Sequence, residues 1–411
     1  MRASIAVVGG GPAGSALARR LALLGYADVV LFERRMPQQR GFAESLSPGV
    51  RVHLDTLGIA VPPGRLCTSK LIRWSGDTER VEIESFIVDR TAFDAHLLDA
   101  AAAAGVRVIR EGVSVERHDT AWRLRAGTTT IETPFLADCT GHAGLLRRTR
   151  RATAPRALAL RARWDAIDAP PEMRICTLPE GWMWGVAGPD GAYHVASFTA
   201  RSRPFLPQSD FFPFLDRPPD VSHACDATPF VSCEPVTRDS ILAGDAACAI
   251  DPLSSSGLQT ALGGAIAASI TVNTILSMPA NTEAAVAFYT DHIARASARH
   301  ARWTRAYFED AAPAPPHAAP LPSPDDVVAL HPGAAIVDAP VVVGDLVALR
   351  RVVRTPAGED VAFLGSIELA PLLADLPKPL TAAQLVRSWR LAPAAIEGVF
   401  RWLILNDVLV H

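Results

Sequence analysis

Three glycines near the N-terminus have the spacing of a loop that binds a phosphate group. Gly9, Gly11 and Gly14 follow the apolar residues 5–8 and precede a pattern of helical periodicity. Gly9 allows a tight turn, Gly11 lets the backbone approach a pyrophosphate, and Gly14 lets the helix pack closely on the strand. Because the N-terminus of a helix carries partial positive charge, it attracts the phosphates.

An acidic residue completes this motif. Glu33 follows a second apolar run, residues 29–32, and lies nineteen residues after Gly14. A carboxylate at the end of this second strand accepts hydrogen bonds from the ribose diol of a dinucleotide. The motif therefore predicts a bound dinucleotide but does not choose between NAD and FAD.

A second loop with glycine and acid comes much later in the chain. The apolar residues 241–243 lead into Gly244 and Asp245. After a further loop, residues 251–256, Gly257 opens a helix rich in small residues. With the first motif, this arrangement resembles flavoproteins of the para-hydroxybenzoate hydroxylase fold, in which the Gly-Asp binds the ribityl chain of FAD. The resemblance also implies that the helix N-terminus faces the flavin ring and stabilises negative charge on it.

Three shorter segments extend this resemblance toward the flavin-dependent halogenases and their relatives, over residues 1–310. They are Glu44-Ser45-Leu46-Ser47-Pro48, Asp89-Arg90-x-x-Phe93-Asp94 and Asp138-Cys139-Thr140-Gly141. Ala43 stands where the first segment usually has glycine. The third departs from the Asp-Gly motif of simple phenol hydroxylases, which contributes to nicotinamide handling, so the electron donor stays open.

The resemblance implies FAD as cofactor, NADH or NADPH as electron donor (directly or through a reductase), and no metal. The residues that it assigns to FAD are Gly9, Gly11, Pro12, Ala13, Gly14, Glu33, Arg34, Glu44, Ser45, Arg90, Gly244, Asp245, Pro252, Ser256, Gly257 and Leu258.

The run 251–257 with Gln259 is similar to the flavoprotein monooxygenases of tryptophylquinone cofactor biogenesis, in quinohemoprotein amine dehydrogenase maturation. These enzymes oxygenate a tryptophan of a partner polypeptide. The resemblance implies that reduced FAD and oxygen form a C4a-hydroperoxide, which hydroxylates an aromatic substrate. We therefore expect an FAD-dependent monooxygenase that acts on a tryptophan side chain of a peptide or protein.

Four residues are candidates for catalysis. Trp182 and Trp184 resemble the Trp-x-Trp-x-Ile-Pro motif of flavin halogenases, with Ala187 in place of the proline; alternatively they pack the wall between flavin and substrate. Lys70, one of two lysines, lies in the interval where halogenases carry the lysine that holds hypohalous acid, although a surface lysine is the other interpretation. His53 is a candidate base or a structural histidine.

We expect an α/β fold (α+β overall): a Rossmann-like FAD-binding domain of the glutathione-reductase/para-hydroxybenzoate hydroxylase type, an inserted antiparallel β-sheet substrate lobe and a small C-terminal winged-helix-like module. The expected bounds are 1–65, 90–155 and 233–310 for the FAD-binding domain, 66–89 and 156–232 for the substrate lobe, 311–325 for a proline-rich linker and 326–411 for the module.

The predicted module contains a hairpin and two helices. Its hairpin joins residues 341–353 and 361–364, and its helices cover 382–390, with Thr381 as N-cap, and 394–405. The last helix has no basic face, which argues against nucleic acid binding. A hairpin edge can instead capture a peptide as an added strand.

Composition limits the remaining alternatives. The net charge of −3 offers no polybasic surface for nucleic acid or an anionic membrane, and no apolar run is expected to span a bilayer. Six scattered cysteines without a Cys-x-x-Cys pair fit a reducing cytoplasm. The rival interpretations are a halogenase served by a separate flavin reductase, a polyprenyl or geranylgeranyl-type reductase, and a non-catalytic flavin-binding scaffold.

Overall fold

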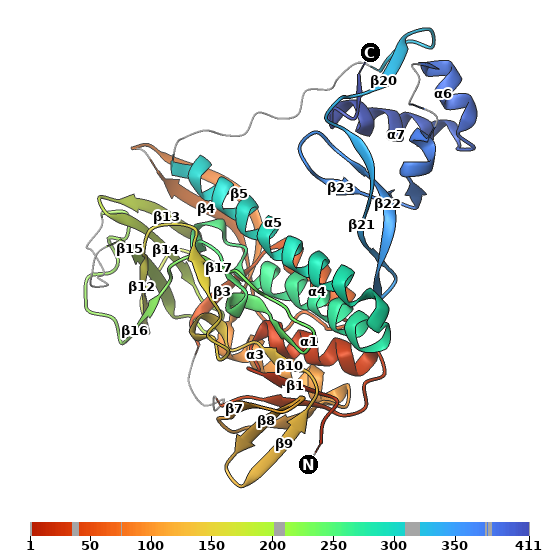
Figure 1. Cartoon of the computed structure of the whole chain (residues 1–411). Helices are drawn as coiled ribbons and strands as arrows, with labels where there is room; N and C mark the ends of the chain where they lie inside the picture. The colour runs from red at the N-terminus through yellow and green to blue at the C-terminus, as the bar shows by residue number, and fades with distance from the viewer. Residues whose placement is uncertain are drawn as a thin grey trace. The chain divides into compact units, whose positions relative to one another are not determined.

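The computed structural model describes residues 2–34, 41–74, 76–200, 210–308, 321–374, 376 and 380–410. The chain divides into two compact units, each seen in Figure 1: residues 1–273 with 289–309, and residues 274–288 with 310–411. The second unit thus includes residues 274–288, where one helix ends and the next begins, although the sequence assigned them to the FAD-binding domain. Residues 311–320 of the predicted linker lie outside the described residues.

A parallel sheet forms the centre of the first unit. Its strand order is β18 (Ser240–Leu242), β10 (Leu136–Asp138), β1 (Ile5–Val8), β2 (Val29–Phe32) and β6 (Arg107–Ile109). The first four strands are buried at every residue, as expected for apolar strands covered on both faces. The βαβ unit predicted from the first glycine motif is confirmed, with helix α1 at Pro12–Leu23.

Helices and a small sheet cover this parallel sheet. Helix α1 packs against α3 (Arg90–Ala103) and β2. The three-stranded sheet β7 (Ser114–His118), β8 (Ala121–Ala126) and β9 (Thr129–Thr133) shares a hydrophobic cluster with β1, β2 and β10. The loops that follow β1, β10 and β18 lie at the C-terminal edge of the parallel sheet, where ligands bind in sheets of this type.

The second sheet of the first unit has eight strands. Their order is β16 (Val221–Asp226), β12 (Leu158–Trp164), β15 (Tyr193–Thr199), β14 (Gly181–Ala187), β13 (Met173–Leu178), β4 (Arg65–Arg73), β5 (Thr78–Asp89) and β3 (Ala43–Leu46). Only β13 and β4 pair in parallel, and the other neighbouring strands of this sheet are antiparallel. Strand β3 is an edge of this sheet, whereas the sequence placed residues 43–46 in the FAD-binding part.

The remaining elements of the first unit are α2 (Pro48–Thr56), the small sheet β11 (Arg150–Ala152), β17 (Phe230–Ser232) and β19 (Cys248–Ala249), and parts of α4 (Gly257–Ser277) and α5 (Thr282–Phe308). By length and composition α4 could cross a membrane, which corrects the expectation of no such run. However, 67% of its most apolar window is buried inside the protein, and a core helix passes the same test.

The second unit contains β20 (Val327–Leu330), β21 (Ala335–Val343), β22 (Leu346–Arg354), β23 (Asp360–Val361), β24 (Phe363–Leu364), β25 (Ile367–Glu368), β26 (Leu380–Thr381), α6 (Ala382–Ser388), α7 (Pro393–Leu405) and β27 (Leu409–Val410). The predicted single strand 341–353 is wrong, because the chain turns at Gly344, where φ is 61°. The N-cap at Thr381 is confirmed by a capping box with Gln384.

Candidate active site

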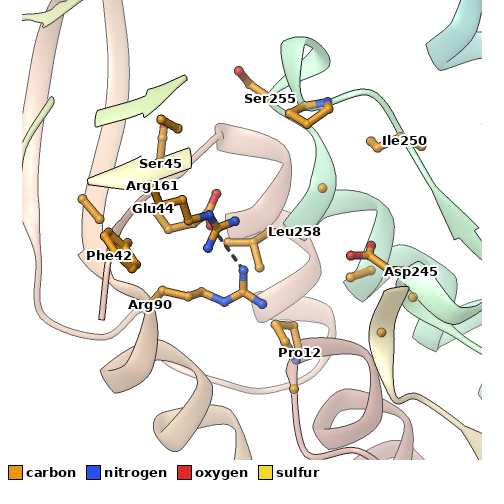
Figure 2. A pocket seen from close by; sticks show the side chains of 18 of the residues that line it. Pro12, Phe42, Glu44, Ser45, Arg90, Arg161, Asp245, Ile250, Ser255 and Leu258 are labelled. Carbon is orange, nitrogen blue, oxygen red and sulfur yellow. Dashed lines mark hydrogen bonds and ion pairs between the residues drawn. The ribbon is translucent and has the colours of Figure 1, made fainter. Parts of the chain in front are cut away.

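Two cavities in the first unit bring the sequence motifs together. One, of about 340 Å³, is lined by the N-terminus of α1, residues 42–45, Arg90, residues 243–258 in part, and strands of the large sheet (Figure 2). The other, of about 430 Å³, is lined by Gly9, Glu33 and Arg34. Cys139 lines both, so together they extend from Glu33 to the N-terminus of α4. An elongated dinucleotide suits this arrangement.

The first glycine loop leaves no room for side chains. Gly9 has φ of 104°, and a Cβ there would overlap the Cys139 carbonyl. A Cβ at Gly14 would overlap the Gly9 carbonyl oxygen. Gly11 precedes α1, and Pro12 is the first residue of that helix. Proline has no N–H, but an N–H at this position would have no hydrogen-bond partner within the helix. The loop thus presents backbone at the helix N-terminus, which fits a pyrophosphate.

Glu33 lies at the other end of this loop. Its carboxylate is buried, and Oε2 accepts a hydrogen bond of 2.6 Å from the Gly10 N–H. Arg34 lines the same cavity. The structure therefore places the predicted ribose-binding acid next to the predicted pyrophosphate loop.

Gly244 and Asp245 follow β18 and face the first cavity. Gly244 has φ of 63°, and a Cβ there would lie 2.7 Å from the Ala13 Cβ. The side chain of Asp245 is accessible to solvent through the cavity, yet the surrounding protein excludes enough water to raise its pKa. The positive charge of Arg90 opposes that rise.

The loop before α4 is held by its own polar side chains. Asp251 accepts a hydrogen bond from the Leu253 N–H at 2.9 Å, and Ser255 adopts a left-handed conformation with φ of 48°. Pro252, Gly257 and Leu258 line the cavity as predicted. Ser256 is not among the lining residues; its hydroxyl donates to the Ser254 carbonyl, and Ser255 faces the cavity instead.

Arg90, the first residue of α3, joins this helix to β3 beside the cavity. Its guanidinium lies 3.2 Å from Glu44 on β3 and 2.8 Å from Asp94 on α3. Burial lowers the pKa of Arg90, but the Asp94 and Glu44 carboxylates more than offset this, so the net pKa is raised and the side chain stays charged. Glu44 and Ser45, which the sequence assigned to FAD, line the cavity.

One face of the large sheet forms the opposite wall. Trp184, Ala196 and Phe198 line the cavity. Trp182 is buried and stacks on Phe198, with ring centroids 4.2 Å apart. Of the two predicted tryptophans, which share one face of β14, Trp184 lines the cavity and Trp182 does not.

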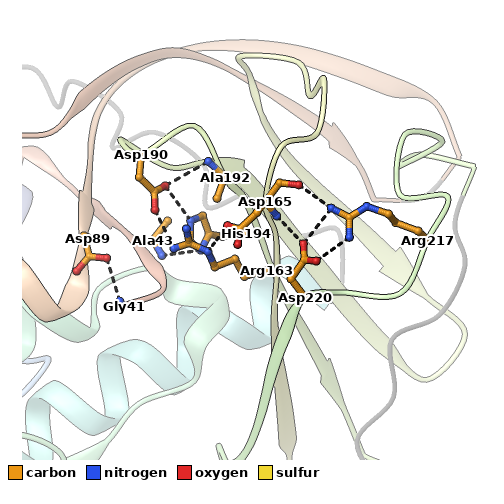
Figure 3. A network of polar contacts seen from close by, with 10 residues as sticks. All are labelled: Gly41, Ala43, Asp89, Arg163, Asp165, Asp190, Ala192, His194, Arg217 and Asp220. Carbon is orange, nitrogen blue, oxygen red and sulfur yellow. Dashed lines mark hydrogen bonds and ion pairs between the residues drawn. The ribbon is translucent and has the colours of Figure 1, made fainter. Parts of the chain in front are cut away.

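His194, which the sequence reasoning missed, also belongs to this wall. Its Nδ1 accepts a hydrogen bond of 3.2 Å from the Ala43 N–H, and its Nε2 lies 3.6 Å from Asp190 (Figure 3). Burial lowers the pKa of His194, and Asp190 opposes that shift. A neutral His194 therefore fastens β3 to β15. Strand alternation alone gave no signal for a contact so distant in sequence.

The other two catalytic candidates lie outside both cavities. His53, on α2, faces Gly263 of α4, where a Cβ would be 3.0 Å from its Nε2; burial lowers its pKa. Lys70, on β4, pairs with Met173 and Val81. Burial lowers the pKa of Lys70, and Glu79 opposes that shift. Lys70 pairs with Met173 and Trp184 pairs with Ile175, two residues along the same strand, so the side chains of Lys70 and Trp184 lie on one face of the sheet. Lys70 nevertheless does not line the cavity.

Comparison with solved structures and characterised proteins gives consistent relatives. The chain superposes on the peptidyl tryptophan dihydroxylase QhpG, essential for tryptophylquinone cofactor biogenesis, with a TM-score of 0.80 and 26% identity over 100% of both chains. The flavin-dependent halogenase CmlS matches with a TM-score of 0.78 and 20% identity over 100% of this chain and 96% of that one.

A tryptophan 2-halogenase of Chondromyces crocatus is 28% identical over 69% of this chain, and the match spans 64% of its own length. No family model matches the sequence. The predicted resemblance to halogenase-like flavoproteins is confirmed, and so is the mixed α/β fold. The chain is therefore an FAD-dependent oxidoreductase with the fold shared by flavin halogenases and halogenase-like monooxygenases.

Proposed function

We propose that this chain is an FAD-dependent monooxygenase that hydroxylates an aromatic substrate, specifically a tryptophan side chain of a partner peptide or protein during quinone cofactor biogenesis. The observation that carries the proposal is the similarity to a peptidyl tryptophan dihydroxylase over the whole of both chains, the second unit included. The aromatic wall of the cavity, with Trp184 and Phe198, suits an indole.

The chain's own residues would hold FAD along the two cavities. The Gly9–Gly14 loop would receive the pyrophosphate, Glu33 the adenosine ribose, and Gly244 with Asp245 the ribityl chain. The N-terminus of α4 would face the flavin ring and stabilise negative charge there. FAD supplies the redox and oxygen-activating chemistry, with NADH or NADPH as the proposed donor.

The protein's remaining task is to position the arene and exclude water. The wall formed by Trp184, Ala196 and Phe198 lines the same cavity as the predicted flavin contacts. An arene packed on this wall would face the flavin in a site from which solvent is displaced. His53 faces Gly263, so we assign it a structural role.

The second unit is the proposed site of peptide capture. Within the described residues, β21 pairs with β22 along one edge, and the order β21-β22-β23 leaves its other edge unpaired. An extended peptide can add to such an edge through main-chain hydrogen bonds. The six free cysteines agree with the cytoplasmic location that we propose.

Halogenation of an aromatic substrate is the second candidate. It is favoured by the tryptophan 2-halogenase relative and by the place of Lys70 on the sheet face that carries Trp184. Under this alternative, Lys70→Ala would abolish halide incorporation while FAD content stays normal. Under our proposal, the same variant retains hydroxylation.

Anaerobic mixing of the FAD-loaded protein with NADH or NADPH tests the proposal, with flavin absorbance as the readout. We expect direct bleaching by one of the two donors, because a single-component monooxygenase accepts hydride itself. Bleaching only after a separate flavin reductase is added would count against this form of the proposal and favour the halogenase alternative.

A further inference from the structure

Two arginines on β12 lie on the face of the large sheet that forms the cavity wall. Arg161 is in register with Ala196 of β15, which is in register with Trp184 of β14. Arg163 is in register with His194 in the same way. Since residues paired across neighbouring strands share a sheet face, Arg161 and Trp184 belong to one row of the wall, with Ala196 between them.

The two arginines differ in their partners. Arg163 is buried and lies 2.7 Å from Asp165 and 2.8 Å from Asp190 (Figure 3). Arg161 lines the cavity, and Figure 2 draws it among the lining side chains. Among the residues that the structure describes, no carboxylate lies within ion-pair distance of Arg161. Asp245 is near enough for Arg161 to lower its pKa, but the two do not form an ion pair.

The carboxylates that line the cavity, Glu44 and Asp245, form no ion pair with Arg161. Arg90 is matched by both Glu44 and Asp94. The predicted FAD contacts come from residues 9–14, the end of β2, β3, α3 and residues 244–258, and none of them comes from β12. Arg161 therefore lines the cavity from a strand without predicted FAD contacts and has no ion-pair partner among the described residues.

We propose that Arg161 binds a carboxylate of the substrate while the aromatic ring of that substrate packs against Trp184. Two strand spacings put the backbones of these residues roughly 10 Å apart. Ala196 between them is small and leaves room for a ligand to lie across the row. A guanidinium binds a carboxylate through paired, charge-assisted hydrogen bonds. This inference rests on the proposed aromatic substrate and adds an acidic group to it.

Ligand binding to the FAD-loaded protein tests this inference without any turnover. The probes are indole-3-acetate and its neutral counterpart indole-3-acetamide, titrated while the flavin absorbance is followed. We expect wild-type protein to prefer the acid. Arg161→Gln should weaken binding of the acid roughly tenfold, because a charged hydrogen bond is lost, and should leave the amide unchanged. Arg161→Lys should retain part of the preference, and the exposed Arg107→Gln serves as the control.

Four results would overturn the inference, three of them concerning Arg161→Gln or chloride. They are an equal effect of Arg161→Gln on acid and amide, an Arg161-dependent response to chloride but not to indole-3-acetate, and loss of FAD from the Arg161→Gln protein. Failure of wild-type protein to bind the acid would overturn it as well. Because binding is measured before any reaction, a halogenated product would refute the proposed hydroxylation while leaving the role of Arg161 intact.

The source of the carboxylate is distinguished by further probes. Free tryptophan compared with tryptophanamide tests the amino acid's own carboxylate. A tryptophan peptide with a neighbouring glutamate, compared with one that has glutamine there, tests an acidic side chain. We expect Arg161 dependence in the peptide pair, because the proposed substrate is a polypeptide; dependence confined to free tryptophan would move the substrate class to the amino acid.

Discussion

At the scale of single residues, the predicted FAD site depends on two glycines that have no Cβ atom. Gly9 and Gly14 lie so close to the backbone of the neighbouring turn that any Cβ would force the loop apart. The same closeness brings the helix N-terminus up to the strand end, where a pyrophosphate can meet its N–H groups.

Gly14→Val should therefore abolish FAD binding, because the new side chain must displace the Gly9 carbonyl. FAD content after purification and the Tm measure the effect. Gly264→Ala is the matched control: a Cβ there meets no atom within 4 Å, and alanine favours the helix by up to about 1 kcal/mol. A Gly14→Val protein with a full complement of FAD would refute the assignment of the loop.

A buried histidine predicts how stability depends on pH. His300 lies on α5, its Nε2 is 3.3 Å from the Thr260 hydroxyl, and its Nδ1 has no hydrogen-bond partner in the described chain. Burial, helped by the charge of Arg299, lowers its pKa from 6.5 to about 4. The unfolded chain therefore takes up this proton at higher pH than the native protein does.

The free energy of unfolding should accordingly fall as the pH drops from about 6.5 towards about 4. The contribution of this histidine is at most roughly 1.4 kcal/mol per pH unit. His300→Gln keeps a polar atom near Thr260 but does not titrate, so its denaturation midpoint should depend less on pH over this range. Parallel pH profiles for the wild type and the variant would contradict this.

Residue types identified most of the candidate site. Gly9, Glu33 and Asp245 carry their chemistry in a local motif, so a single sequence reveals them. Arg161 and His194 escaped prediction because their roles depend on the register of strands far apart in the sequence. The sequence alone does not show whether an arginine has an ion-pair partner in the folded protein.

At the scale of elements, the segment leading into β3 is fixed at two points. Asp89, at the end of β5, accepts hydrogen bonds from the Gly41 N–H at 3.0 Å and from the Ala92 N–H at 2.8 Å, which caps α3. The Nδ1 atom of His194 accepts a hydrogen bond from the Ala43 N–H. One carboxylate thus positions both the start of α3 and the strand that carries Glu44.

Asp89→Ala should cost about 1 kcal/mol of stability, because α3 loses its N-cap, and should weaken FAD binding as well. Asp89→Asn, which can still cap the helix, should restore most of both properties. Urea denaturation and FAD titration measure them. Loss of stability without any change in FAD affinity would show that the contact with Gly41 does not shape the site.

Element prediction succeeded where the signal was local. The βαβ unit and the N-cap at Thr381 each follow from neighbouring residues, and both are confirmed. The predicted single strand 341–353 is wrong because Gly344 makes a turn within a run of aliphatic residues, although its second half does form the expected hairpin with residues 360–361. The place of β3 in the large sheet depends on pairing with β5, some forty residues away, which no local pattern indicates.

At the scale of the whole molecule, the chain has two units, and the QhpG match covers both. The sequence predicted a C-terminal module and its helices, but not that residues 274–288 belong with it. Within the second unit, Val347 of β22 donates to Thr274 Oγ1 at 2.8 Å and accepts from Asn281 Nδ2 at 3.0 Å. These contacts bind residues that are nearly seventy positions apart.

Deletion of residues 326–411 tests the proposed peptide capture. The truncated chain should keep its FAD, because the lining residues of both cavities lie in the first unit, and should lose activity on a tryptophan peptide. Activity on free indole should persist and serves as the control. Unchanged turnover of the peptide would rule out a capturing role for these residues.

The nature of the atom added to the substrate tests the central claim most directly. The FAD-loaded protein would react with a tryptophan peptide and with free indole under isotopically labelled dioxygen, with NADH, NADPH, a flavin reductase and bromide all present. Mass spectrometry then identifies the added atom. We predict products that carry the oxygen label and no bromine; brominated products without the label would contradict the monooxygenase assignment and establish the halogenase alternative.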